Sequence, residues 1–216
     1  MSDLGPRLEA ALAFLTGAEC LADVGADHGF FSIEAVRRGL AKRAVAIDDK
    51  PGPLARAREN IAAAGLESSI RPVLADGLPP DHGCDVVAVL GLGGITIAEI
   101  LGAADLQNVR RLILGPHSEP AATRLWLERN GFSITAEAFV RERGKHYQIV
   151  TAVKGPMKLT DAERAFGPYI LQAGNPVFRA YLAMRLHQLE SGRKRTLDPA
   201  RAEDLERRIA ALKELL

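Results

Sequence analysis

The sequence predicts an α/β protein with a doubly wound, Rossmann-like sheet, followed by a short α-helical extension. Three observations support this fold class. Short apolar runs alternate with amphipathic runs between about residues 20 and 130, loops rich in glycine and aspartate follow several apolar runs, and the pattern becomes entirely helical after about residue 155. Strands separated by helices are joined by right-handed crossovers and form a mainly parallel sheet.

Composition fits one domain with an appendage. The chain has 216 residues, of which 47% are apolar and 25% charged, and its net charge is +1. These values exclude a disordered acidic tail and a strongly basic histone-like protein. No apolar run approaches the roughly 18 to 20 residues that span a bilayer. Residues 1–13 lack the layout of a signal peptide, so we expect a cytoplasmic protein that does not enter the membrane.

The two cysteines, Cys20 and Cys84, are far apart in the sequence, and each begins an apolar run. Neither belongs to a Cys-x-x-Cys pair, so the sequence offers no zinc or redox motif. We expect both to be buried free thiols in a reducing cytoplasm.

The first two strands are predicted at residues 20–24 and 44–48. Residues 25–29 read Gly-Ala-Asp-His-Gly and lead into a helical pattern at residues 30–39. Two prolines, Pro51 and Pro53, mark the entry to the next helix, which Gly65 closes.

The alternation continues to about residue 153. Further strands are predicted at residues 70–75, 85–90 and 111–114, with helices at 95–101 and 121–130. Residues 133–141 and 146–153 alternate in polarity around a turn at 142–145, which is typical of a β-hairpin. The sheet should therefore end in an antiparallel strand, as in the class I methyltransferase variant of the doubly wound fold.

A helical extension is predicted from residue 156 to residue 216. Thr160 and Glu163 form a capping-box pattern, Asn175 precedes a long helical pattern ending at Gly192, and Asp198 precedes another. Two antiparallel, coiled-coil-like helices are the natural interpretation. We therefore divide the chain into a ligand-binding domain, residues 1–155, and this extension.

The loop after the first strand carries most of the chemical signal. It reads Asp23-x-Gly25-x-Asp27-His28-Gly29, which is not the Gly-x-Gly-x-x-Gly of dinucleotide enzymes. An acid before the first glycine suits a cationic amino-acid ligand better than a pyrophosphate. S-adenosylmethionine, which carries an ammonium and a sulfonium, fits this chemistry, although a purely structural turn remains an alternative.

Two further acids end the next strands. Asp48 closes the second strand, where a carboxylate accepts both ribose hydroxyls of an adenosine cofactor. Asp76 and Gly77 end the third strand, where they would contact the adenine ring. A helix cap for Asp48 and a plain turn for Asp76-Gly77 are the competing interpretations.

The loop after the fourth strand contains Gly91, Gly93 and Gly94. Three glycines in four residues favour close approach of the cofactor or a flat substrate, with a tight turn as the alternative. The histidines His28, His117 and His146 are not spaced as metal ligands, so we expect no metal.

Taken together, these stretches resemble the bacterial tRNA (adenine-22-N1)-methyltransferase family. The similarity follows the family's order over nearly the whole chain. Its segments are Ala22-Asp-Val-Gly-Ala-Asp-His28, Gly52-Pro53, Gly65-Leu66, Asp76-Gly-Leu78, Gly91-Leu-Gly-Gly94, Leu112-Ile-Leu114 with Pro116, Trp126-Leu127, Gly144-Lys-His-Tyr147 and Phe166-Gly-Pro168.

The resemblance implies methyl transfer from S-adenosylmethionine to N1 of an adenine in tRNA. It implies that Asp27 lies near the target base, and we take Asp27 as the candidate catalytic residue, with His28 or His117 as the weaker candidate. The resemblance places the cofactor positions at Asp23, Gly25, Asp48, Asp76 and the loop of Gly91 and Gly93. To these we add His28 and Gly77 for the cofactor, and we assign Gly94, Pro116, His117 and the basic run Arg193, Lys194 and Arg195 to the substrate.

Two departures from the family pattern stand out. The fifth strand ends Gly115-Pro116-His117 where the family has Gln-Pro-Asn, and the acid of the second strand is Asp48 rather than Glu. The first departure keeps open a methyltransferase of the same fold that acts on another RNA or a small molecule. A non-catalytic module that binds S-adenosylmethionine and RNA is the third possibility.

Charge is unevenly distributed along the chain. Residues 1–155 carry a net charge of −2, whereas residues 156–216 carry +3, with Arg193, Lys194 and Arg195 at the predicted bend between the last two helices. The extension is therefore a candidate contact for tRNA, with an ordinary solvated face as the alternative. The oligomeric state is left open, and a monomer is consistent with the sequence.

Overall fold

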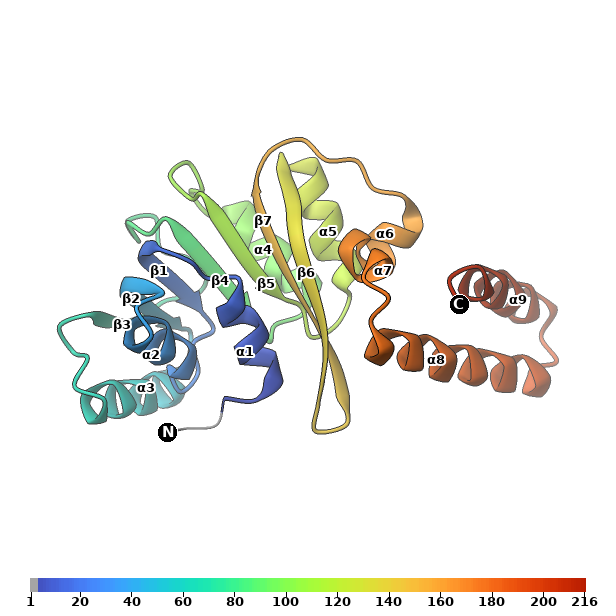
Figure 1. Cartoon of the computed structure of the whole chain (residues 1–216), viewed down its shortest axis with the longest axis horizontal. Helices are drawn as coiled ribbons and strands as arrows, with labels where there is room; N and C mark the ends of the chain where they lie inside the picture. Colours follow the sequence, from blue (N-terminus) through green and yellow to red (C-terminus); the bar gives the residue numbers. More distant parts are fainter. Residues whose placement is uncertain (1–3) are drawn as a thin grey trace. The chain divides into compact units, whose positions relative to one another are not determined.

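The computed structural model describes residues 4–216, and the chain divides into two units, one ending at Pro168 and the other spanning Tyr169–Leu216 (Figure 1). The first unit is built on a seven-stranded sheet of order β3-β2-β1-β4-β5-β7-β6. Its strands are β1 (Ala18–Val24), β2 (Ala41–Asp48), β3 (Ile70–Leu74), β4 (Val86–Leu90), β5 (Arg111–Gly115), β6 (Phe132–Glu142) and β7 (Lys145–Lys154).

The first five strands are parallel, and β7 pairs antiparallel with both β5 and β6. The strand order reverses between β1 and β4, which are neighbours in the sheet although β2 and β3 separate them in the chain. In doubly wound sheets, ligands bind outside the carboxyl ends of the strands at such a point. The predicted fold class is confirmed.

Helices cover both faces of the sheet. They are α1 (Pro6–Ala13), α2 (Phe30–Arg37), α3 (Pro51–Ala63), α4 (Gly94–Ala103), α5 (Pro120–Arg129) and α6 (Asp161–Phe166). Side chains of α1, α2 and α3 pack in one core cluster, and those of α4 and α5 in another. The five residues of β4 are all buried and alternate between the two clusters, as expected for a central parallel strand.

Helix α1 is absent from the sequence prediction, which considered residues 1–13 only as a targeting segment. Pro6 occupies its first turn, and its residues Ala11 and Leu12 are buried in the first core cluster. The helix thus brings the N-terminal segment against the sheet, near β6 and β7.

The two cysteines correct another expectation. Cys20 in β1 and Cys84 just before β4 form a disulfide, so the residues 4–216 contain no free thiol. The pairing follows from the sheet, because β1 and β4 are neighbours and their starts meet at the same edge. The two Cα atoms are 4.4 Å apart across 64 residues of sequence.

The division between the units follows Pro168 rather than Gly155, because α6 is bound to the first unit. Arg164 of α6 pairs with Glu128 of α5 at 2.8 Å. The fully buried Arg124 pairs with Glu137 at 2.8 Å and donates to the carbonyls of Arg164 and Phe166. The predicted capping box of Thr160 and Glu163 is present at the start of α6.

The second unit consists of α7 (Pro168–Gln172), which begins at the boundary, α8 (Pro176–Arg195) and α9 (Pro199–Lys213). Asn175 and Asp198 cap α8 and α9 as predicted. Ion pairs from Arg193 to Glu206 and from Lys213 to Glu190 join the two helices in antiparallel fashion. Helix α8 continues past Gly192, so Arg193, Lys194 and Arg195 form its last turn rather than the bend. Among residues 4–216, no helix is both long and apolar enough to cross a membrane.

Candidate cofactor and methyl-transfer site

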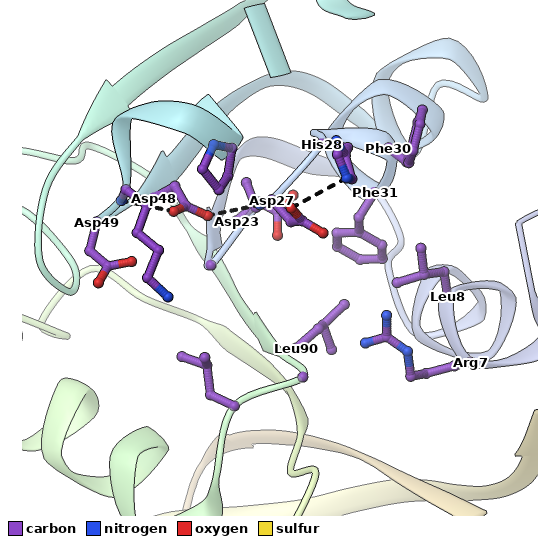
Figure 2. Close-up of a pocket in the computed structure, with 16 residues that line it drawn as sticks. Arg7, Leu8, Asp23, Asp27, His28, Phe30, Phe31, Asp48, Asp49 and Leu90 are labelled. Carbon is purple, nitrogen blue, oxygen red and sulfur yellow. Dashed lines mark hydrogen bonds and ion pairs between the residues drawn. The ribbon is translucent and has the colours of Figure 1, made fainter. Parts of the chain in front are cut away.

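A cavity of about 370 Å³ lies at the carboxyl ends of β1, β2 and β4 (Figure 2). Its wall combines residues from the loops after these strands with two residues of α1, Arg7 and Leu8. The volume falls within the usual range of small-molecule sites, about 300 to 1,000 Å³. The topology therefore places a ligand-sized space at the point where the strand order reverses.

Asp23, near the end of β1, is buried at the base of this cavity. One of its carboxylate oxygens accepts a hydrogen bond from Ser32 Oγ at 2.8 Å. Burial raises the pKa of Asp23 to about 6, and the nearby Asp48 acts in the same direction, whereas the Ser32 hydrogen bonds and the Arg7 charge oppose the shift. Such a carboxylate is prepared to receive a cation, because an ammonium partner would offset the cost of its burial.

Asp48, at the end of β2, organises the loop after β1. Its two carboxylate oxygens accept the backbone N–H groups of Asp27 and Lys50, each at 3.0 Å. The helix-cap interpretation of Asp48 is wrong, because the N-cap of α3 is Lys50 and no side chain caps this helix. Because each carboxylate oxygen has two lone pairs, these bonds leave Asp48 capacity to accept ribose hydroxyls as well.

Asp27 occupies an uncommon backbone conformation. Its φ is +51°, in the left-handed region that residues other than glycine, asparagine and aspartate rarely adopt. Its side chain is 66% exposed, lines the cavity and lies 3.6 Å from His28 Nε2. Figure 2 shows the Asp27 carboxylate between Asp23 and Phe31, facing the cavity. A backbone residue that its surroundings hold in a sparsely populated conformation is often part of a functional loop.

Two glycines allow close packing around the cavity. Gly25 has a φ of +75° and faces Leu92, and Gly91 has a φ of +87°. A Cβ atom on residue 91 would lie 3.2 Å from Arg7 Nη1, so glycine leaves room for that guanidinium. Both positions require glycine for backbone conformation.

Six of the predicted site residues in the first unit do not line the cavity. They are Asp76, Gly77, Gly93, Gly94, Pro116 and His117. Asp76 is exposed and Gly77 has a φ of +78°, just beyond β3. Because β3 is next to β2 in the sheet, both residues lie at the same edge as Asp48.

The loop after β4 pairs with the loop after β5. Gly93 forms a parallel bridge with Ser118, and the His117 amide donates to the Leu92 carbonyl at 2.7 Å. Gly94 is buried, and a Cβ there would overlap the Glu119 carbonyl, so its glycine serves backbone packing. Pro116 is buried, whereas His117 is exposed beside the cavity loop.

The sequence prediction missed several cavity residues, chiefly Arg7, Leu8, Phe30 and Lys50. Arg7 and Leu8 precede β1 and carry no motif, and only the amphipathic pattern of residues 6–13 would have indicated a helix there. Phe30 and Lys50 lie directly after the loops at the ends of the first two predicted strands. Extending the predicted site by one or two residues beyond each loop would have included them.

The charges of the cavity fit an adenosyl amino acid with a positively charged sulfur. Four carboxylates line it, those of Asp23, Asp27, Asp48 and Asp49, together with the cations of Arg7 and Lys50. An excess of negative charge favours a cationic ligand, and the Arg7 guanidinium can pair with a carboxylate on that ligand. Among residues 4–216, no group of three or more potential metal ligands occurs.

In the second unit, the predicted basic run is partly neutralised. Arg193 pairs with Glu206 at 2.6 Å, and Arg195 Nε donates to the Ser191 carbonyl at 3.1 Å. Lys194 and Arg195 are exposed at the end of α8. The structure therefore leaves these two cations as the accessible part of the run.

Comparison with known proteins identifies the family. A tRNA (adenine(22)-N(1))-methyltransferase of Bacillus subtilis is 28% identical over 98% of this chain and 92% of its own length. A Streptococcus pneumoniae structure in complex with S-adenosyl-L-methionine is 35% identical, with a TM-score of 0.89 over 97% of this chain and 98% of that chain.

A Mycoplasma capricolum TrmK structure in complex with S-adenosyl-homocysteine is 26% identical, with a TM-score of 0.89 over 98% of this chain and 96% of that one. The family described as TrmK, tRNA (adenine(22)-N(1))-methyltransferase, matches residues 21–214. The resemblance found in the sequence is confirmed, and the chain belongs to the tRNA (adenine(22)-N(1))-methyltransferase family.

Proposed function

We propose that this protein transfers a methyl group from S-adenosylmethionine to N1 of adenine 22 in tRNA. The observation that carries the proposal is the acidic cavity at the carboxyl ends of β1, β2 and β4, in a chain of this family. The cavity has the size, position and charge that the cofactor requires. A cytoplasmic location accords with a tRNA substrate.

The cofactor would be held by residues on three strand ends. Asp23 receives the ammonium of the amino-acid part, Asp48 accepts the ribose hydroxyls, and Gly25, His28 and Gly91 form the adjoining wall. Asp76 and Gly77 follow β3, the neighbour of β2, and are assigned to the adenine ring. Gly93 supports this site through its pairing with Ser118.

Methyl transfer needs positioning more than acid–base chemistry. When bound, S-adenosylmethionine supplies a methyl group on a positively charged sulfur, and this charge passes to the adenine ring as the methyl moves to N1. Neutral adenine already has a lone pair at N1. Asp27 would accept a hydrogen bond from the exocyclic amine, which orients the ring and stabilises the positive charge that develops on it.

The tRNA would approach over the paired loops after β4 and β5. His117 is exposed there, next to the cavity loop, while Pro116 and Gly94 maintain the backbone that presents it. Because N1 lies on the pairing edge of adenine, the base must be unpaired or flipped out to react. In the second unit, Lys194 and Arg195 would contact phosphates without reading sequence.

The test is nucleoside mass spectrometry of unmodified tRNA incubated with the protein and S-adenosylmethionine. We expect 1-methyladenosine, mapped to position 22, and its loss when adenine 22 is replaced by guanine. Methylation of another nucleoside would favour the same fold acting on a different substrate. Absence of any methylated product, with intact cofactor binding, would favour a non-catalytic binding module.

A further inference from the structure

The Arg7 guanidinium faces the cavity from α1. In Figure 2 it lies on the side opposite Asp48 and Asp49. None of the salt bridges among residues 4–216 involves the Arg7 side chain. A Cβ atom added to Gly91 would lie 3.2 Å from Arg7 Nη1. A guanidinium in this situation is suited to an anionic ligand group, which it binds through two parallel hydrogen bonds.

Two contacts from the β6–β7 hairpin hold Arg7 in place. Its backbone N–H donates to Glu142 Oε2 at 2.9 Å, which fixes the start of α1. Its guanidinium carbon lies 5.6 Å from the centre of the Tyr147 ring, within the range of a cation–π interaction. The hairpin therefore determines both where α1 begins and where the guanidinium points.

The Tyr147 ring is supported in turn by His117. The two ring centres are 5.5 Å apart and the planes are inclined by 63°, an edge-to-face contact. The amide of His117 is bonded to the Leu92 carbonyl, beside Gly91. Arg7, Tyr147 and His117 thus form a continuous row of contacts around the loop after β4.

We propose that Tyr147 is a positioning residue for the cofactor: its ring holds the Arg7 guanidinium above Gly91, where it binds the carboxylate of the cofactor's amino-acid end. The inference rests on the proposed function. The amino-acid end carries an ammonium and a carboxylate on one carbon, and the cavity places Asp23 and Arg7, one of each complementary charge, on its wall.

Two ligands isolate this role. S-adenosylhomocysteine has the carboxylate, and S-adenosyl-3-thiopropylamine differs only in lacking it. Isothermal titration calorimetry with the full-length protein should show that the wild type prefers the first ligand by about 30-fold, the range of hydrogen bonds to charged groups. Arg7→Met should abolish the preference.

The Tyr147 variants then test the positioning step. Tyr147→Leu should reduce the preference by about 5-fold, since it removes the cation–π contact, while Tyr147→Phe, which keeps the ring, should retain it. Affinity for the ligand without the carboxylate should stay unchanged in both Tyr147 variants. Tyr169→Leu, which removes a tyrosine from the second unit, is the matched control for loss of a ring.

An equal loss of affinity for both ligands in Tyr147→Leu, or a preference equal to that of the wild type, would overturn the inference. Thermal melting of each variant separates these outcomes from misfolding, and Tyr147→Phe supplies a folded comparison. If the wild type bound neither ligand, the proposed function itself would fail. Binding of both ligands by the wild type, without the carboxylate preference, would contradict the inference alone.

Discussion

The two units of the chain hold their charged residues in different ways. In the first unit, Asp23 is buried and Asp48 accepts two backbone N–H groups, so each carboxylate is fixed by the fold. In the second unit, Lys194 and Arg195 lie exposed on the last turn of a helix. The difference suits the division that we propose between methyl transfer, which needs fixed groups, and phosphate contact, which needs only accessible charge.

The largest effect is expected from Asp27→Asn. Asparagine tolerates the left-handed backbone of residue 27, so the fold should remain intact. The amide oxygen lacks the negative charge that stabilises the developing positive charge on adenine, and the turnover rate should fall by about 10²- to 10³-fold. Single-turnover methylation of tRNA measures this change.

The matched control for this variant is Asp161→Asn, at a fully exposed position on α6. It should leave the rate and the cofactor affinity unchanged. Full activity of Asp27→Asn, with normal binding of S-adenosylmethionine, would remove Asp27 from the mechanism.

Gly94→Ala should test how tightly the first unit is packed. The added Cβ would overlap the Glu119 carbonyl, so the starts of α4 and α5 must separate. We expect the free energy of unfolding to fall by about 3 kcal/mol, as for other overpacked core positions. Urea denaturation measures the change, and Gly102→Ala, whose Cβ would meet its nearest neighbour at 3.5 Å, is the control. Equal stability of the two variants would contradict this account of Gly94.

Asp23→Asn separates stability from binding. Because burial raises the pKa of Asp23 from 3.8 to about 6, the folded protein binds this proton more readily than the unfolded chain does. The ionised carboxylate therefore costs about 3 kcal/mol of stability above pH 6, and that cost disappears as the pH falls from about 6 to about 4.

The variant should consequently melt at a higher temperature than the wild type at pH 8 and at the same temperature near pH 4. Its affinity for S-adenosylmethionine should be lower by about 30-fold at pH 8, because the ammonium loses its charged partner. Wild-type affinity should weaken as the pH falls through about 6, while that of the variant stays flat. A variant that melts lower at pH 8 would show that Asp23 stabilises the free protein.

The smallest effect is expected in the second unit. Replacing both Lys194 and Arg195 with Gln should weaken tRNA binding about 3- to 10-fold and reduce the slope of log affinity against log salt by about 2. Stability and the rate at saturating tRNA should not change. A change in cofactor affinity would break the proposed division between the units. Lys42→Gln, at an exposed position on β2, is the control.

Much of the fold was predictable because each of the five parallel strands is a short apolar run that ends at or just before glycine or aspartate. The loop after β1 was predictable for the same reason, since Asp23 lies near the end of such a run and Gly25 and Asp27 follow it directly. The family match confirms what these motifs implied about the enzyme class. At these positions, residue type and spacing within a short segment were sufficient to predict the structure.

Other features depend on pairing between distant segments. The Cys20–Cys84 disulfide joins residues that become neighbours only when β1 and β4 pair. Arg7 reaches the cavity because α1 packs near β6 and β7, where the Arg7 amide bonds to Glu142, 135 positions later. Neither the hydrophobic periodicity nor a local motif predicts such contacts, because they depend on which strands become neighbours in the folded sheet.

The bond between Asp48 and the Asp27 amide also has a pharmacological consequence. A single side chain serves the assigned nucleoside subsite and anchors the backbone of the residue assigned to the target base. A competitive inhibitor that drew Asp48 into a new rotamer would remove the hydrogen bond that its carboxylate accepts from the amide of residue 27. Such a compound would act in two ways, by displacing the methyl donor and by loosening the loop that we assign to the target adenine.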